Sequence, residues 1–143
     1  MEPRIHLVTL GVSDLQRAVR FYRDGLGWHT SMKKHEDVAF FQMGGMVLAL
    51  WDRNKLAEDA NLPPAEPRPF EGFSLAQCVA SKAEADAALA AAEAAGGTIL
   101  KHAEDTFWGG YSGYFTDPDG YPWEVAWNPG WTLTPERTIR LPE

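Results

Sequence analysis

Two stretches of the chain open in the same way, and this internal repeat is the feature that most constrains the fold. LVTLGVSDLQRAVRFYRDGLGW begins at Leu7, and SLAQCVASKAEADAALAAAEAAGG begins at Ser74. Each stretch reads as an apolar strand, a serine-led helix cap, an amphipathic helix and a glycine stop. Val12 and Val79 occupy equivalent points 67 residues apart, nearly half of the 143-residue chain. Two copies of one unit bring two half-sheets together, and we expect the functional site between them.

The pattern predicts the same order of elements in both copies. In the first copy we predict one helix after Ser13-Asp14 and strands at 5–12, 28–33, 38–43 and 46–51. In the second copy we predict a helix at 83–95, capped by Ser81 and Glu84, and strands at 73–79, 98–102, 113–116 and 123–127. Two helices are too few for a doubly wound parallel sheet, and glycine turns join successive strands. We therefore predict an α+β fold of two βαβββ modules, which form a cup-shaped, mostly antiparallel sheet with helices on its outer face.

The chain reads as a single domain over 1–143. Its parts are module one at about 5–52, a linker at about 53–71, module two at about 72–128 and a tail at 129–143. The linker is rich in proline, which is typical of a segment over the surface, and it has room for a short helix near 54–60. The tail has no clear period, so we expect it to wrap loosely or to meet a second subunit.

Charge and cysteine content exclude several classes of partner. The formal net charge is −7, and no cluster of Lys and Arg relieves it. Phosphate backbones and anionic membranes repel such a chain, so we predict no nucleic-acid or membrane partner. The lone cysteine, Cys78, permits no internal disulfide, and no segment resembles a signal peptide or a membrane span. We predict a cytoplasmic protein.

Two motifs carry a resemblance to a known family. They are GVSDLQRAVRFYRDGLGW near the start and YFTDPDGYPWEVAWNP near the end. Together they resemble the vicinal-oxygen-chelate superfamily, which includes glyoxalase I, bleomycin-resistance proteins and extradiol dioxygenases. The resemblance covers about residues 5–128 and implies paired βαβββ modules, often within a homodimer. It also implies, for the metalloenzymes of the family, one divalent ion that holds two adjacent substrate oxygens.

The resemblance also implies four metal-ligand positions, and this chain keeps a donor of the family type at one of them. Leu7 and Ala49 stand at two of these positions, Ser74 at the third and Glu124 at the fourth. Leucine and alanine donate nothing, and a divalent ion needs three or more protein donors to be held well. We therefore predict no metal and no other cofactor.

A one-residue slip of a strand exchanges its two faces, so a second ligand set stays open. A bulge that brings His6 inward, with a matching slip at Gln77, gives a site of His6, Gln77 and Glu124 for one divalent metal ion. Such a site predicts a metal-dependent lyase or dioxygenase of the glyoxalase type. The other histidines lack ligand spacing and are predicted at the surface: His29, His35 and His102.

Residues on the strands of the predicted cup are candidates for the site. Glu124 stands in an apolar strand, where an unpaired carboxylate is costly to bury, so it is our candidate catalytic residue, able to bind or move a proton. Thr9 shares strand parity with Leu7, and Trp51 shares it with Ala49, so both are candidate ligand contacts. The tryptophans on either side of Glu124 have the other parity, and we predict that Trp123 and Trp127 pack under a helix.

The sequence DTFWGGYSGYF interleaves large rings with glycines ahead of the second motif. Glycines let a backbone turn sharply close to a ligand, and rings supply stacking area. We predict ligand contacts by Trp108, Tyr111 and Tyr114, with the first two in an aromatic lid. The alternative is a hairpin whose rings complete the core.

These observations favour a glyoxalase- or bleomycin-resistance-like protein that lacks most of the family's metal ligands. We predict that it binds a small, largely apolar or aromatic molecule in an aromatic-lined cup, as a binding protein or as a minor enzyme. An acidic cup equally suits a cationic ligand. The alternatives are the metal-dependent enzyme and an interaction module whose cup is filled by its own side chains.

Overall fold

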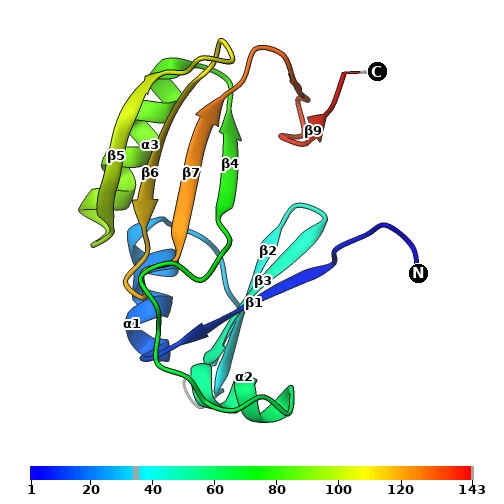
Figure 1. Cartoon of the computed structure of the whole chain (residues 1–143), viewed down its shortest axis with the longest axis vertical. Helices are drawn as coiled ribbons and strands as arrows, with labels where there is room; N and C mark the ends of the chain where they lie inside the picture. The colour runs from blue at the N-terminus through cyan, green and yellow to red at the C-terminus, as the bar shows by residue number, and fades with distance from the viewer. Residues whose placement is uncertain (34–35, 143) are drawn as a thin grey trace. The chain divides into compact units, whose positions relative to one another are not determined.

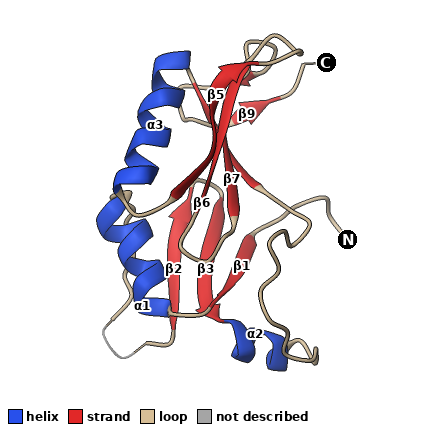
Figure 2. Cartoon of the chain, turned by 60° about the vertical axis from the view of Figure 1, so that its left-hand side comes forward, coloured by secondary structure: helices blue, strands red, loops and turns tan. Residues whose placement is uncertain are grey.

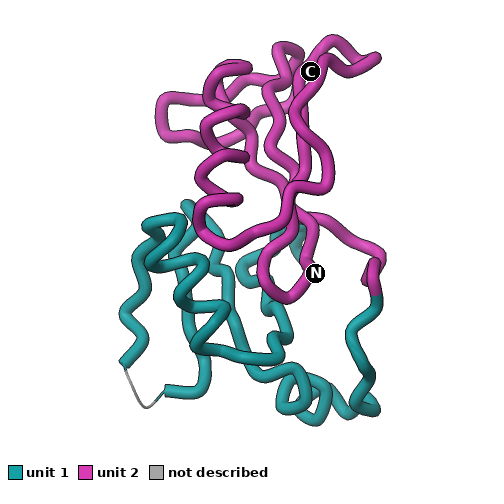
Figure 3. The backbone as a smooth tube through the Cα atoms, turned by 90° about the vertical axis from the view of Figure 1, so that its left-hand side faces the viewer, with its two compact units in different colours: residues 1–68 teal, residues 69–143 magenta. Residues whose placement is uncertain are grey.

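The computed structural model describes residues 1–33 and 36–142 and divides into two compact units, 1–68 and 69–143 (Figure 3). The boundary between the units falls inside the predicted proline-rich linker. Unit 1 contains the first copy of the repeat, and unit 2 contains the second. None of the helices in the described ranges is both long and apolar enough for a membrane span.

Unit 1 contains a three-stranded sheet in the order β1-β3-β2 (Figures 1 and 2). Its elements are β1 (Leu7–Val12), α1 (Leu15–Val19), the π-helical turn η1 (Arg20–Gly25), β2 (Val38–Met43), β3 (Met46–Asp52) and α2 (Arg53–Asp59). β1 runs parallel to β3, and β2 runs antiparallel to β3. The predicted short helix of the linker is confirmed as α2.

The first helix begins and ends where the sequence predicts. The Asp14 side chain caps α1 by accepting a hydrogen bond from the Arg17 amide at 2.9 Å. The helix widens into η1, where the Leu26 amide donates to the Phe21 carbonyl five residues earlier, at 2.9 Å. Gly27 follows at a φ of 74°, a left-handed conformation that favours glycine and stops the helix.

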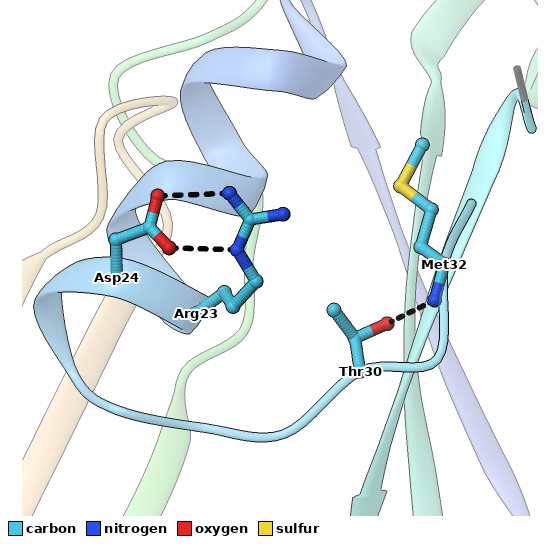
Figure 4. A network of polar contacts seen from close by, with 4 residues as sticks. All are labelled: Arg23, Asp24, Thr30 and Met32. Carbon is cyan, nitrogen blue, oxygen red and sulfur yellow. Dashed lines mark hydrogen bonds and ion pairs between the residues drawn. The ribbon is translucent and has the colours of Figure 1, made fainter. Parts of the chain in front are cut away.

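The predicted strand at 28–33 is wrong. Only Thr30 pairs with the sheet, through one isolated antiparallel bridge to Phe41. The reason is local, because the Thr30 hydroxyl accepts a hydrogen bond from the Met32 amide at 3.2 Å (Figure 4). A side chain that bonds to its own backbone offers the chain an alternative to the sheet ladder. Figure 4 also shows the exposed Arg23–Asp24 ion pair of η1, at 2.7 Å.

Strand register divides the sheet of unit 1 into two faces. Phe41 packs against Tyr22 of η1, with ring centroids 5.9 Å apart, so its side of the sheet is the helix face. Leu48 pairs with Phe41 and lies on that face. Thr9 and Ala49 pair with each other on the other side, which we call the opposite face.

Unit 2 is a complete βαβββ module, as predicted (Figure 2). Its elements are β4 (Leu75–Val79), α3 (Lys82–Ala94), β5 (Thr98–Asp105), β6 (Tyr111–Thr116) and β7 (Pro122–Trp127), followed by β8 (Thr132–Leu133) and β9 (Ile139–Arg140). The sheet order is β4-β7-β6-β5, with β4 parallel to β7 and the other pairs antiparallel.

The predicted capping box of α3 is confirmed, with one shift. The Ser81 hydroxyl accepts from the Glu84 amide at 3.1 Å. Glu84 Oε2 accepts in return from the amide of Ala80, one residue before the cap, at 3.0 Å. The same oxygen forms an ion pair with Arg137 at 3.0 Å.

Helix α3 covers the helix face of unit 2. Gly113 of β6 lies on this face, since a Cβ there would come within 2.6 Å of Leu89 Cδ1 in α3. Trp123 is 6% exposed, and Trp127 lies below Lys82, whose Nζ is 5.9 Å from the ring centroid. The prediction that both tryptophans pack under a helix is confirmed.

The turn before β7 is closed by its own first residue. Asp117 is only 3% exposed, and its Oδ1 accepts from the amides of Asp119 at 3.0 Å and Tyr121 at 2.9 Å. Gly120 has a φ of 87°, which a left-handed turn position requires. The predicted tight turn is confirmed.

The tail is more ordered than the sequence predicts. β8 and β9 form an antiparallel hairpin, which the Arg137–Glu84 ion pair connects to the start of α3. A contact of this tail with a second subunit stays a prediction.

The predicted α+β class is confirmed, with sheets of mostly antiparallel strands. The strands form separate sheets of three and four strands, with a two-stranded hairpin, where one sheet was predicted. The cup requires both modules, and it stays a prediction.

Candidate functional site

The repeat is visible in the pairing of the outer strands. In unit 1, β1 runs parallel to β3, and Thr9 lies across from Ala49. In unit 2, β4 runs parallel to β7, and Ala76 lies across from Glu124. Thr9 and Ala76 are 67 residues apart, the offset of the repeat. Ala49 and Glu124 are therefore equivalent positions, one aliphatic and one acidic.

The register also places the other family ligand positions. Leu7 lies on the opposite face of unit 1, together with Thr9 and Ala49, because side chains alternate along a strand. The β1–β3 ladder is regular from Leu7 to Val12, so no bulge turns His6 to this face. Ser74 directly precedes β4, two residues before Ala76.

The alternative ligand set is not brought together. Gln77 pairs with Val125 of β7 and has the parity of the helix face, whereas the neighbouring Glu124 lies on the opposite face. His6 is exposed and has the parity opposite to Leu7. Across residues 1–33 and 36–142, no group of three or more His, Cys, Asp or Glu side chains is placed to hold a metal ion. The residues at these positions do not fit the family's divalent ion.

Glu124 lies in a row of side chains that crosses the opposite face of unit 2. Ala76 of β4 is its neighbour on one side, and Tyr114 of β6 is its neighbour on the other. Tyr114 and Glu124 face each other directly across the β6–β7 ladder. Burial raises the pKa of Tyr114, and the negative charge of Glu124 raises it further. The two predicted site residues are therefore cross-strand neighbours on one face.

Two residues beside this pair were missed by sequence reasoning. Lys101 of β5 extends the row, across from Tyr114, and forms an ion pair with Glu104 at 2.9 Å. Cys78 lies on the same face, and burial followed by the charge of Glu124 raises the pKa of its thiol. Strand parity with Ser74 could have identified Cys78. Lys101 follows a register shift after Ile99, which no sequence pattern indicated.

Tyr111 does not belong to a lid. It pairs with Trp127 on the helix face, and its hydroxyl donates to Asp86 of α3 at 2.8 Å. Lys82 Nζ lies 5.3 Å from the ring centroid. The hydrogen bond to Asp86 is the main cause of the raised pKa of Tyr111. Its ring contributes to helix packing, as the alternative interpretation of the glycine–aromatic segment predicts.

Trp108 lies in the tight hairpin between β5 and β6. The Thr106 hydroxyl closes this hairpin by accepting from the Gly110 amide at 3.0 Å, and Gly109 has a φ of 87°. The Trp108 ring covers Gly110 so closely that a Cβ there would collide with it. Trp108 is 41% exposed, and Phe107 beside it is fully exposed. A ligand contact by Trp108 stays a prediction.

The opposite face of unit 1 carries Thr9 and Trp51, as predicted. Trp51 pairs with Gly11, and a Cβ on that glycine would lie 3.1 Å from the Cα of Arg53 at the start of α2. The Trp51 ring is partly buried, and its Nε1 is fully buried without an acceptor in the part of the chain that the structure describes. Of the predicted surface histidines, His29 and His102 are exposed, and His35 lies outside the described residues.

Trp51→Phe should leave the free energy of unfolding within about 1 kcal/mol of wild type. The smaller ring loses packing, but removal of an unsatisfied buried N–H recovers about 1–3 kcal/mol. Chemical denaturation measures this. The same substitution at Trp123, whose ring stacks on Phe115 with centroids 6.2 Å apart, should be clearly destabilising. A large loss for Trp51→Phe would show that its N–H has an acceptor, such as a bound water.

Each unit contains a sheet with a helix on one face and a parallel strand at one edge, and this repeated module defines the class of the glyoxalase fold. The family model for the glyoxalase/bleomycin resistance protein/dioxygenase superfamily matches residues 4–125, and the chain belongs to this family. The resemblance inferred from the two motifs is therefore confirmed.

Solved structures agree with this assignment. The chain is similar to a glyoxalase-related enzyme from Fulvimarina pelagi, with 33% identity, a TM-score of 0.87, and coverage of 98% of this chain and 99% of that one. A glyoxalase/bleomycin resistance protein/dioxygenase from Nocardioides has 29% identity, a TM-score of 0.71 and coverage of 91% and 87%. A lactoylglutathione lyase from Agrobacterium tumefaciens has 29% identity, a TM-score of 0.68 and coverage of 90% and 96%. No curated protein matches the chain.

Proposed function

We propose that this family member binds a small, largely apolar or aromatic molecule without a resident metal ion. The observation that carries the proposal is the Glu124–Tyr114 pair on the opposite face of unit 2. A partly buried carboxylate beside an aromatic ring gives one polar anchor and one stacking surface, the usual composition of a small-molecule site. Thr9 and Trp51 of unit 1 and Trp108 of unit 2 are further proposed contacts.

The donor atoms support the metal-independent part of the proposal. Leu7 and Ala49 share one face of unit 1 and offer no lone pair. Ser74 offers a neutral hydroxyl, and only Glu124 offers a carboxylate. Stable binding of a divalent ion takes three or more protein donors of the kind that leucine and alanine lack. In this chain Glu124 is therefore free to act on an organic ligand.

Glu124→Gln should change ligand binding while leaving the fold intact. The amide keeps the size of the side chain and an acceptor for Tyr114, but it removes the charge and the proton-accepting capacity. We would screen aromatic compounds by quenching of tryptophan fluorescence, with EDTA present throughout. Hits of the wild type should bind the variant at least about threefold more weakly or lose their pH dependence. Equal binding by both proteins at every pH would remove Glu124 from the site.

The alternative is a metal-dependent lyase or dioxygenase, and the likeness to the lactoylglutathione lyase from Agrobacterium tumefaciens is the observation that favours it. Metal analysis of the purified protein separates the two functions. About one equivalent of Ni, Zn, Mn or Fe, together with an activity that a chelator removes, would replace the binding proposal. Ligand binding that persists in EDTA would support it.

We further propose a cytoplasmic homodimer. The support is the lone Cys78, which suits a reducing compartment, and the pairing of modules across two chains in members of this superfamily. Analytical ultracentrifugation should give twice the mass of the 15.9 kDa chain. A monomer over the micromolar range would contradict the dimer.

A further inference from the structure

We propose that Glu124 selects an organic cation, so that the ligand carries a protonated amine next to a flat apolar group. This inference rests on the proposed function and deepens it by naming the chemical class of the ligand. The support for it is the set of groups that surround the Glu124 carboxylate on the opposite face of unit 2.

The first step is the charge balance around Glu124. In the described ranges, no Lys, Arg or His forms an ion pair with this carboxylate. The cation in its row is Lys101, and Lys101 is paired with Glu104 at 2.9 Å. The other titratable groups near Glu124 on this face are Tyr114 and Cys78, and neither carries a positive charge. Within the described residues, no side-chain cation therefore pairs with Glu124.

The second step is the remaining hydrogen-bonding capacity of the carboxylate. An ionised carboxyl group has two oxygens with about four acceptor positions. On one side of Glu124 lies Tyr114, whose single hydroxyl can satisfy one of these positions. On the other side, the exposed Ala76 of β4 contributes only a methyl group and no donor. An ammonium group, with up to three N–H donors, supplies both the missing charge and the missing donors.

The third step is the neighbouring ring. Tyr114 is partly buried and pairs with Glu124 across the ladder, so ring and carboxylate belong to one surface. An aromatic face attracts a cation, most strongly where water is partly excluded. The flat part of an aromatic amine adds apolar contact with the same surface. A neutral aromatic ligand would use the ring and leave the carboxylate to water.

The test compares two probes of nearly equal size and shape. Benzylamine is protonated at pH 7, and benzyl alcohol is neutral, although both present a benzyl group and a hydrogen-bond donor. We expect the wild type to bind benzylammonium at least about tenfold more tightly in isothermal titration at low salt. This preference should shrink at 0.5 M NaCl, because salt screens charge interactions.

Matched variants assign the preference to one carboxylate. Glu124→Gln should reduce the preference to within about twofold, because benzylammonium loses much more affinity than benzyl alcohol does. Glu93→Gln removes the same charge from an exposed position on α3 and should keep the full preference. Tyr114→Phe keeps the ring but removes its hydroxyl, so we expect a preference between those of the wild type and Glu124→Gln.

Each outcome has a distinct meaning. Equal affinity for both probes in the wild type overturns the cation inference and leaves the binding function standing. A preference that survives Glu124→Gln, or that Glu93→Gln also removes, overturns it as well, because the charge acting is then not that of Glu124. Binding of neither probe, with silence across the wider aromatic panel, overturns the binding function itself. The measured quantity is the ratio of the affinities of one protein for the two probes. A smaller folded fraction lowers the apparent binding of both probes alike, so it does not change this ratio.

Discussion

Gly113→Ala should lower the free energy of unfolding by about 3 kcal/mol, near the upper end for overpacking of a core. A Cβ at this position would lie 2.6 Å from Leu89 Cδ1, and 2.7 Å from both the Ala103 amide nitrogen and the Lys101 carbonyl oxygen. Two of these three atoms are backbone, so a change of side-chain rotamer cannot remove the clash. Urea denaturation followed by circular dichroism measures the loss.

A second glycine gives the matched control. Gly45→Ala adds the same methyl group where nothing lies within 4 Å, so its effect should stay within about 0.5 kcal/mol. Adding Leu89→Ala to Gly113→Ala should not restore the wild-type stability, because the backbone contacts remain. Equal stability of Gly113→Ala and wild type would mean that β5 moves aside freely, against the close packing described for unit 2.

Tyr22→Ala should cost about 4 kcal/mol, as expected for removal of a fully buried aromatic side chain. Tyr22 is fully buried, and its ring stacks on Trp28 with centroids 5.3 Å apart and meets Phe21 edge-on at 4.9 Å. The substitution leaves a cavity between η1 and the sheet of unit 1. Denaturation by urea and the loss of near-ultraviolet circular dichroism should both report it.

The control for Tyr22→Ala lies on the other face of the same sheet. Phe40 is 49% exposed, so Phe40→Ala should cost less than about 1 kcal/mol although it also removes an aromatic ring. A similar loss in the free energy of unfolding for Tyr22→Ala and Phe40→Ala would contradict this prediction, because burial of the ring would then not determine the cost of removing it.

The elements that depend on local signals were predictable from the sequence. The caps at Asp14 and Ser81, the left-handed stop at Gly27 and the turn at Asp117 each follow from a residue that bonds or bends its own backbone. Strand parity likewise predicted the contrasting positions of Trp123 and Glu124. Each of these signals depends on residues that are close together in the chain, so a single sequence is enough to recognise it.

The predictions that fail do so because other interactions override the simple alternation of side chains along a strand. The predicted strand near Thr30 ends after one bridge because the hydroxyl bonds to the Met32 amide. Lys101 enters the row of Glu124 through a register shift in β5, which depends on the space that Gly113 leaves. The glycine–aromatic pattern predicts Tyr111 in a lid, whereas its parity with Gly113 places it on the helix face, beside α3.

The self-closed turns of unit 2 also determine the order in which its strands can assemble. Thr106 and Asp117 each satisfy amides within their own turn, so the β5–β6–β7 meander needs no distant partner to reverse direction. β4 is different, since its parallel pairing with β7 joins segments separated by α3 and two further strands. Long-range pairing costs more loop entropy and forms more slowly than adjacent hairpins. We therefore expect the edge strand next to Glu124 to dock last during folding, so that the face carrying Glu124 is completed only at that step.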